Sequence, residues 1–268
     1  MASPLQGGTS PLQAGAAVEI SGIQKTFLSA RGAIHALAET NLTIGQGQFV
    51  SIVGPSGCGK STLLSLIAGL DAPSAGKVVI KGQEVRGPHE SLGVVFQRDL
   101  LLDWRTVMDN VLLQVEMRGL APKAHAAAAR QLLDMVGLQE FHGRYPRELS
   151  GGMRQRVAIC RALVHNPLLL LMDEPFGALD AISRDRLNVD LGRICSETKK
   201  TVIFITHSIA EAVFLGDRVV VMSSRPGRVV VDMNIEAPHP RDLSFRETAQ
   251  FAGYVREVRQ IFEAEGVL

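Results

Sequence analysis

The segment Gly54–Ser61 limits the possible folds of this chain more than any other. Its sequence, GPSGCGKS, matches the phosphate-binding pattern GxxxxGK[ST]. An apolar strand is expected immediately before it, at Phe49–Val53, and leucine and isoleucine follow at helical spacing from Lys60 to Ala68. Backbone N–H groups and the helix dipole both point into such a loop, so it is a ready anion site. The chain is therefore expected to bind the phosphates of a nucleotide.

The side chains of this loop favour a nucleoside triphosphate together with a divalent metal ion. Lys60 can reach the terminal phosphates, and the hydroxyl of Ser61 can bind Mg²⁺, which prefers oxygen ligands. Cys58 lies at a helix N-terminus that favours its thiolate, which predicts alkylation that ATP blocks; a small residue that only fills space is the alternative. The predicted nucleotide-binding residues of this segment are Gly54, Pro55, Ser56, Gly57, Cys58, Gly59, Lys60, Ser61 and Thr62.

Two carboxylates follow a second apolar segment. The strand expected at Leu168–Met172 leads into Asp173 and Glu174, at the edge of a sheet where ligands bind. Asp173 is predicted to hold the metal, directly or through water, and Glu174 to polarise an attacking water as general base. Such a pair alone is a weak signal, but together with a phosphate loop it predicts hydrolysis of the nucleotide.

The rest of the pattern predicts a mostly parallel α/β core with a helical insert between Gln97 and about Pro167. The last segment, after about residue 235, has apolar residues on one helical face, which we interpret as core packing. Further strands are expected at Val18–Ile20, Asn41–Ile44, Lys77–Lys81, Leu92–Phe96, Thr201–Thr206, Arg218–Ser223 and Arg228–Asp232, the last two as a hairpin, and further helices at Ala124–Val136 and Ile182–Glu197.

Composition and charge exclude several other classes of protein. Hydrophobic residues make up 46% and charged residues 21%, which is ordinary for a globular chain. The 28 basic and 27 acidic residues leave a net charge of +1, so bulk charge indicates no nucleic-acid partner. No apolar run approaches the roughly 20 residues of a membrane span, and Met1–Ala17 lacks the basic start of a secretory signal. Three cysteines without a CxxC pair fit a reducing compartment, and a cytosolic chain is expected.

A second glycine-rich motif lies at Leu149–Arg156, with the sequence LSGGMRQR. It resembles the LSGGQ signature of ATP-binding-cassette (ABC) ATPases, with Met153 in place of the usual glutamine. Ser150 is a good N-cap, and Gly151 and Gly152 expose N–H groups at a helix start, so this is an anion site without its own lysine or carboxylate. The resemblance implies a P-loop ABC ATPase fold and a head-to-tail dimer, in which Ser150, Gly151 and Gly152 of one copy cap the ATP of the other.

Further segments are similar to motifs of this family and occur in the expected order. Gln97 matches the glutamine that contacts Mg²⁺ and the membrane partner, and His207 matches the histidine that contacts the γ-phosphate. Asp180 belongs to a loop, Gly177–Asp180, that crosses the dimer interface in the family. Phe27 stands where the family places the aromatic residue that stacks on adenine; a core phenylalanine is the alternative. The predicted catalytic residues are Glu174, His207 and Gln97, and the predicted metal ligands are Ser61, Gln97 and Asp173.

The resemblance covers roughly Val18–Asp232 and implies an ABC ATPase domain at 18–235 with an antiparallel β-subdomain and a helical subdomain at about 98–166. Residues 1–17 carry no charge and no apolar period, so we interpret them as a disordered tail. Residues 236–268 are interpreted as a C-terminal helical extension.

Within the family, the chain resembles importers of taurine, aliphatic sulfonates, nitrate and similar small anions. The resemblance lies in Gly93–Gln97, Leu101–Val107, Asp109–Val111, Asp173–Ala181 and Ser224–Arg228. Asp103 stands where that subfamily usually has proline, on the surface expected to receive the permease. The implied function is that of the ATP-hydrolysing subunit of a bacterial small-anion importer at the cytoplasmic face of the membrane. The implied partners are a second copy, a separate permease and, indirectly, an external solute-binding protein. The alternatives are the ATPase of an exporter or lipid-transport complex and an ATPase that acts on nucleic acid or ribosomes.

Overall fold

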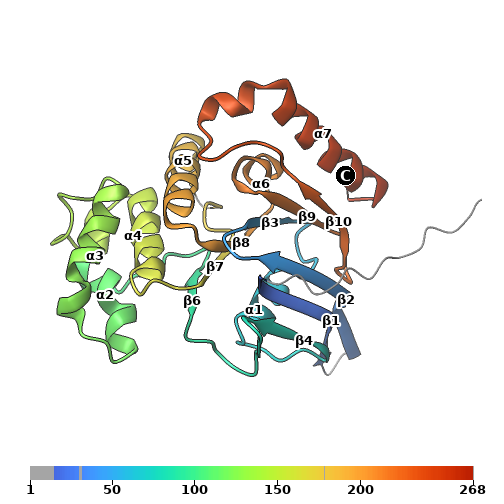
Figure 1. The fold of residues 1–268 in the computed structure, drawn as a ribbon, viewed down its shortest axis with the longest axis horizontal. Helices are drawn as coiled ribbons and strands as arrows, with labels where there is room; N and C mark the ends of the chain where they lie inside the picture. The colour runs from blue at the N-terminus through green and yellow to red at the C-terminus, as the bar shows by residue number, and fades with distance from the viewer. Residues whose placement is uncertain (1–14, 30–31, 178, 268) are drawn as a thin grey trace, which may run out of the picture.

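The computed structural model describes residues 15–29, 32–177 and 179–267, which form two sheets surrounded by helices (Figure 1). Within these residues the smaller sheet is antiparallel and has the order β2-β1-β4-β5. Its strands are β1 (Ala16–Ser29), β2 (Gly32–Gly45), β4 (Ala75–Ile80) and β5 (Gln83–Glu84).

The larger sheet has the order β10-β9-β3-β8-β7-β6 in the described part of the chain. All neighbouring strands are parallel except β9 and β10, which form the expected antiparallel hairpin. Its strands are β3 (Phe49–Val53), β6 (Leu92–Val95), β7 (Leu169–Asp173), β8 (Thr201–Thr206), β9 (Arg218–Met222) and β10 (Val229–Asn234).

The larger sheet is buried on both faces, which explains why its central strands are mostly apolar. In β3, Val50 and Ile52 pack with α1 (Lys60–Ile67) and the smaller sheet. Phe49 and Val53 point the opposite way, into a core shared with the helices that follow later in the chain. Because the carboxyl ends of β3, β6, β7 and β8 meet at one edge of this sheet, the loops after them lie together.

The helical insert predicted between Gln97 and about Pro167 is present and lies to one side of the sheets (Figure 1). It consists of α2 (Val107–Met117), α3 (Pro122–Met135), a short 3₁₀ turn at Pro146–Glu148 and α4 (Gly151–Leu163). Val111, Leu133 and Val157, one from each helix, are fully buried at its centre. Helices α2 and α4 pack against each other, so α4 links the insert to β6 and α5 (Ala181–Thr198).

The C-terminal segment packs onto α6 (Ile209–Leu215) through α7 (Ala249–Ala264), which follows a 3₁₀ turn at Leu243–Glu247. Phe251, Val258 and Phe262 of α7 are buried, which confirms that the apolar face of this helix is core packing. Upstream of it, the buried Arg241 donates hydrogen bonds to the carbonyls of Val213, Phe214 and Gly216 at 2.9–3.0 Å.

The N-terminal strands are the main difference from the sequence-based expectation. Instead of short strands at Val18–Ile20 and Asn41–Ile44, β1 and β2 form one long hairpin. Register shifts along it interrupt the apolar–polar alternation, so the outer half was not recognisable as strand. The boundary of the predicted tail at residue 17 is also wrong, because β1 begins at Ala16; residues 1–14 of that tail lie outside the described residues.

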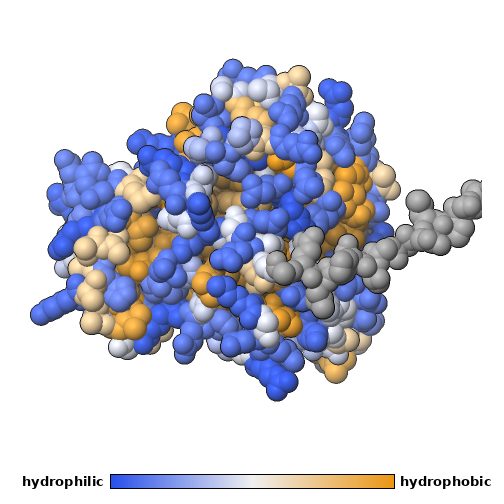
Figure 2. All heavy atoms as spheres, viewed as in Figure 1, coloured by the Kyte–Doolittle hydropathy of each residue, from blue (hydrophilic) through white to orange (hydrophobic). Residues whose placement is uncertain are grey.

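None of the helices that the structure describes is both long and apolar enough to cross a membrane. Figure 2 shows that hydrophilic residues cover most of one face, with hydrophobic residues gathered in smaller patches, one of them over the helical insert.

Candidate functional site

A cleft of about 500 Å³ opens at the carboxyl edge of the larger sheet, between the phosphate loop and the β1–β2 hairpin. It is formed by segments far apart in the chain, including the ends of β6 and β7 and the turn between β9 and β10. The structure therefore brings together most of the residues that the motifs predicted. The cleft is lined by Phe27, Ile34, Ala36, Ser56, Gly57, Gly59, Lys60, Ser61, Thr62, Gln97, Asp173, Glu174 and Arg225.

The phosphate loop has a backbone that only glycine adopts easily. Gly59 has φ +108° and precedes the first residue of α1. A Cβ atom built there would lie 2.8 Å from the carbonyl oxygen of Ala36 and 2.7 Å from a methyl carbon of Leu37, so a side chain would collide with β2. Within the described residues, no side chain caps the N-terminus of α1. Its first N–H groups are therefore placed to bind an anion.

Lys60 is almost completely buried, with 4% of its surface exposed. Its Nζ donates hydrogen bonds to the carbonyl oxygens of Gly54 and Pro55, at 2.9 and 3.0 Å, and lies 4.0 Å from Oε1 of Glu174. The loop thus holds the ammonium group at the base of the cleft, where the oxygens of a triphosphate are the matching charge. This is the position that the phosphate-loop motif predicted for a phosphate-binding lysine.

The residues predicted to bind a metal lie side by side. Oγ of Ser61 donates a hydrogen bond to Oδ1 of Asp173 at 3.1 Å, and Gln97 lines the same cleft. Burial raises the pKa of Asp173, and the charge of Glu174 raises it further, while Ser61 and Lys60 partly oppose both effects. A bound cation would favour the ionised carboxylate. Hydroxyl, amide and carboxylate oxygens are a donor set that fits Mg²⁺.

The described residues contain no cluster of three or more His, Cys, Asp or Glu side chains that would hold a metal ion by themselves. A metal ion at Ser61 and Asp173 would therefore take further oxygen ligands from the nucleotide or from water, as is usual for Mg²⁺ in phosphoryl-transfer sites.

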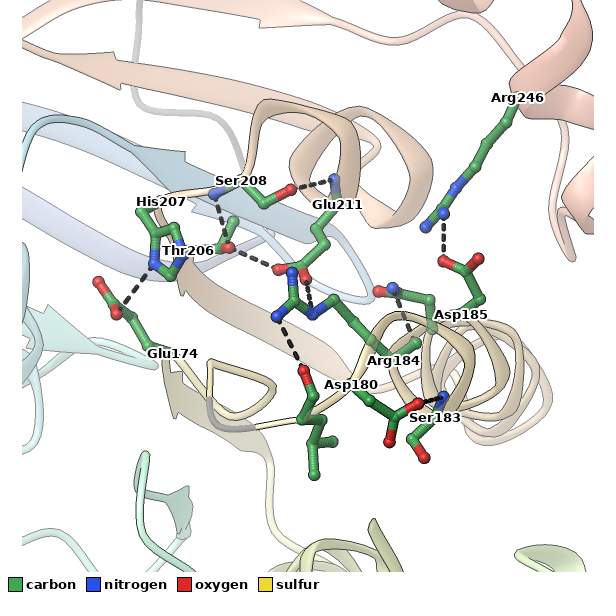
Figure 3. Close-up of polar contacts among 12 residues, drawn as sticks. Glu174, Asp180, Ser183, Arg184, Asp185, Thr206, His207, Ser208, Glu211 and Arg246 are labelled. Carbon is green, nitrogen blue, oxygen red and sulfur yellow. Dashed lines mark hydrogen bonds and ion pairs between the residues drawn. The ribbon is translucent and has the colours of Figure 1, made fainter. Parts of the chain in front are cut away.

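Glu174 occupies a strained position directly after β7. Its φ is +44°, which is uncommon for a residue other than glycine, and such strain is concentrated at functional sites. Its N–H donates to the carbonyl of Ile205 in β8 at 2.9 Å, and its Oε2 lies 3.1 Å from Nδ1 of His207. Figure 3 shows the two side chains facing each other. Glu174 is thus held between Lys60 on one side and His207 on the other.

The second predicted anion site lies away from the cleft of its own chain. Ser150 is the N-cap of α4 and accepts a hydrogen bond from the N–H of Met153 at 3.3 Å. Cβ atoms built on Gly151 and Gly152 would lie 3.7 Å from Leu179 and Ser183, at the start of α5.

Asp180 caps α5 in the same neighbourhood, where its Oδ1 accepts from the N–H of Ser183 at 3.0 Å; hydrogen bonds to Ser183 lower the pKa of this carboxyl. In the described part of the chain, Asp180, Ser150, Gly151 and Gly152 do not line the cleft of Lys60.

Two details of the sequence-based picture change. Cys58 is 1% exposed and packs into the core beneath the loop, and burial raises the pKa of its thiol, so the prediction of a favoured thiolate is wrong. The alternative of a small buried residue fits the structure.

Phe27 is 40% exposed and lines the cleft, which excludes the alternative of a core phenylalanine. Its stacking on adenine stays a prediction.

Sequence reasoning missed Arg225 as a residue of the cleft. Its Nε donates to the carbonyl of Gly57 in the phosphate loop at 3.1 Å. Arg225 lies in the turn between β9 and β10, far from the loop in sequence, and its motif there was informative only about the subfamily. Because β9 and β3 are neighbours in the sheet, the turn after β9 reaches the loop after β3.

Comparisons with known proteins agree with this geometry. A family model described as ABC transporter matches residues 37–177. The chain is 48% identical to the taurine import ATP-binding protein TauB of Rhizobium johnstonii, over 86% of this chain and 90% of that relative. It is 43% identical to the nitrate import ATP-binding protein NrtD of Synechocystis sp., over 91% of this chain and 94% of that relative.

A solved structure supports the fold and the nucleotide site together. It is a dimeric ATP-binding cassette, MJ0796, in a post-hydrolysis state bound to ADP and Pi. The two structures align with a TM-score of 0.70 at 34% sequence identity, over 82% of this chain and all of that one.

Proposed function

The chain belongs to the ABC transporter family as an ATP-hydrolysing subunit, and on that premise we propose that it drives the import of a small anion through a separate permease. The observation that supports this most is the convergence of Lys60, Ser61, Asp173 and Glu174 in one cleft. The relatives include taurine, nitrate and aliphatic sulfonate import proteins, and we place taurine or an aliphatic sulfonate first as the solute and nitrate next. The chain would act at the cytoplasmic face of the membrane, with a solute-binding protein on the other side.

The proposed binding step is an exchange of partners at Lys60. In the structure its ammonium group donates hydrogen bonds to two loop carbonyls. The phosphate oxygens of ATP would replace these carbonyls, because hydrogen bonds between two charged groups are stronger. Mg²⁺, held by Ser61, Gln97 and Asp173, would neutralise part of the phosphate charge during transfer. Phe27, at the hairpin side of the cleft, would stack on the adenine ring.

The proposed chemical step depends on Glu174. Its carboxylate is close enough to Lys60 to face the terminal phosphate and would accept a proton from the attacking water. His207, 3.1 Å from the same carboxylate, would orient Glu174 and contact the γ-phosphate. Because Ser150 and Asp180 lie outside the cleft of their own chain, we propose that a second copy supplies them, in a head-to-tail dimer with two composite sites.

The permease would bind near the segment that precedes α2. Trp104 is 74% exposed there, and Leu100 is exposed as well. Exposed aromatic residues beside aliphatic ones are typical of docking surfaces between proteins. Asp103, next to Trp104, would help to select one permease over others.

Co-purification tests the proposal. The tagged Glu174→Gln chain would be isolated from detergent-solubilised membranes of the source cells with ATP present, and its partners identified by mass spectrometry. We expect a polytopic permease whose associated binding protein takes up taurine, an alkanesulfonate or nitrate in a binding screen. As a matched control, Trp104→Ala is expected to lose the permease while it still binds ATP. Ribosomal proteins or nucleic acid without a permease would contradict the transport function, and an exporter or a lipid-transport complex would contradict import.

A further inference from the structure

A buried polar network lies directly behind Glu174 and His207 (Figure 3). Thr206, the last residue of β8, donates its hydroxyl proton to Oε2 of Glu211 at 2.6 Å and accepts from the N–H of Ser208 at 3.0 Å. Glu211 is 5% exposed, and its own N–H donates to Oγ of Ser208 at 3.3 Å. The backbone on both sides of His207 is therefore tied to Glu211.

Arg184 lies on the other side of this carboxylate. Its Nε is 3.5 Å from Oε1 of Glu211, and its Nη2 donates to the carbonyl oxygen of Leu179 at 3.0 Å. Leu179 belongs to the segment Gly177–Asp180, which leads into α5 and is close to Gly151 at the start of α4. One ion pair thus connects the loop of His207 to this segment, in addition to the direct proximity of Gly177 to His207.

The ion pair is incomplete in this structure. Arg184 Nε is buried, yet among the described residues it has no acceptor at hydrogen-bond geometry, although buried donors are normally satisfied. Burial raises the pKa of Glu211, and the hydrogen bond of Thr206 and the charge of Arg184 oppose this. A small shift of Leu179 or Thr206 would therefore be enough to shorten the contact between Arg184 and Glu211.

We propose that Arg184 and Glu211 are positioning residues that couple the segment Gly177–Asp180 to His207. Contact of that segment with the second copy would move Leu179 and, with it, Arg184. The ion pair between Arg184 and Glu211 would then shift Thr206, and the shift of Thr206 would change the position of His207 relative to Glu174. Neither Arg184 nor Glu211 lines the nucleotide cleft in the described residues, so they act through other groups. The inference rests on the roles proposed above for Glu174 and His207.

The neighbouring ion pair between Asp185 and Arg246 provides a matched control. It joins the same helix, α5, to the C-terminal segment, and Arg246 also lies 4.7 Å from the ring centroid of Phe214. It contacts neither Leu179 nor Thr206 among the interactions of the described residues. Asp185→Asn removes this pair while Arg246, whose charge also acts on Glu211, stays in place.

The test measures ATP hydrolysis against ATP concentration for Arg184→Gln, Glu211→Gln, their double variant and the control Asp185→Asn, in the full chain. Glutamine at position 211 keeps an acceptor for Thr206 and loses only the charge. We expect kcat to fall about tenfold or more in each single variant, with KM for ATP within about twofold of the wild type. The double variant should be no slower than the slower single variant, because both remove one connection. Asp185→Asn should keep kcat within about twofold.

Thermal unfolding of every variant separates positioning from stability. The inference is overturned if the single variants lose kcat only in proportion to a loss of Tm, if the double variant loses the product of the two single effects, or if Asp185→Asn is equally slow. Glu174→Gln is measured in parallel: wild-type turnover in that variant would reject the proposed chemistry instead, whatever Arg184 and Glu211 do.

Discussion

The helix α1 follows a glycine-rich loop and α4 begins with two glycines, Gly151 and Gly152, yet the two N-termini differ in almost every other respect. α1 begins at the buried Lys60, faces Asp173 and Glu174, and has no side-chain cap within the described residues. α4 is capped by Ser150, and its nearest neighbours are the exposed start of α5 and Leu179. Its nearest cation, Arg154, already pairs with Asp99 at 3.0 Å.

The start of α1 is thus part of a complete phosphate site, whereas the start of α4 is only half of such a site. The loop before α1 has its own cation and carboxylates, so it can bind and position a triphosphate within one chain. The start of α4 has only N–H groups and a hydroxyl, which can stabilise an anion that something else holds. Substitutions in the cleft beside α1 should therefore change ATP binding or hydrolysis within one chain. Substitutions at the start of α4 should change only what a second copy contributes to that cleft.

The largest effect is expected for Glu174→Gln. Loss of the general base should lower ATP turnover by about 10²–10⁴-fold, while ATP affinity stays within about twofold because Lys60 and the loop are intact. Phosphate release and an equilibrium ATP titration measure the two quantities. Glu265→Gln, which only removes a remote ion pair with Arg228, should leave both unchanged. Normal turnover in Glu174→Gln would exclude the proposed base.

Lys60→Ala should act on binding in the cleft itself. A lost charge-assisted hydrogen bond costs about 1.5–3 kcal/mol, so ATP affinity should fall by about tenfold or more. Arg225→Gln is the comparison, because Arg225 lines the same cleft from its rim, and its effect should be only a few-fold. Equal affinity of Lys60→Ala and the wild type in a titration would refute the role of this lysine.

Ser150→Ala tests the other half of the comparison. We expect turnover to fall by about tenfold with no change in ATP affinity at the cleft of the same chain, since Ser150 would act on the ATP of the second copy. The lost N-cap should also cost about 1 kcal/mol of stability. Thr106→Ala, which removes the equivalent cap of α2, controls for that loss and should leave turnover unchanged. If Ser150→Ala lowered ATP affinity as much as Lys60→Ala does, Ser150 would instead act on the ATP bound in the cleft of its own chain.

The smallest effect is expected for the thiol of Cys58. Burial raises its pKa, so the reactive thiolate is scarcer than in a free cysteine at pH 7, and alkylation should be slow and should accelerate as pH rises. ATP should change the rate by less than about twofold. Mass spectrometry after timed labelling measures this, with the unfolded chain as the reference for full reactivity. Rapid labelling that ATP blocks would restore the prediction made from sequence.

The sequence was most informative where a motif and its flanking elements are contiguous. Strand β3, the glycine-rich loop and α1 follow one another, and so do β7, Asp173 and Glu174, so apolar periodicity and residue type were sufficient to predict them. The outer half of the β1–β2 hairpin was missed because its register shifts remove the alternation by which strands are recognised.

Electrostatic environment was less predictable than position. A helix N-terminus at Cys58 suggested a thiolate, but the side chain points into the core, and desolvation outweighs the nearby positive charge of Lys60. The direction of that side chain depends on how α1 packs against β2 and β9, which the local pattern does not contain.

The sequence by itself determined the fold class, the phosphate-binding chemistry and the order of the motifs, because each depends on residues next to one another in the chain. Only the tertiary structure decided which distant residues share a site. Arg225 reaches the phosphate loop because β9 lies beside β3, and Arg184 meets Glu211 because α5 and α6 pack together. Those contacts join segments that are far apart in the sequence, so no local pattern of residues specifies them.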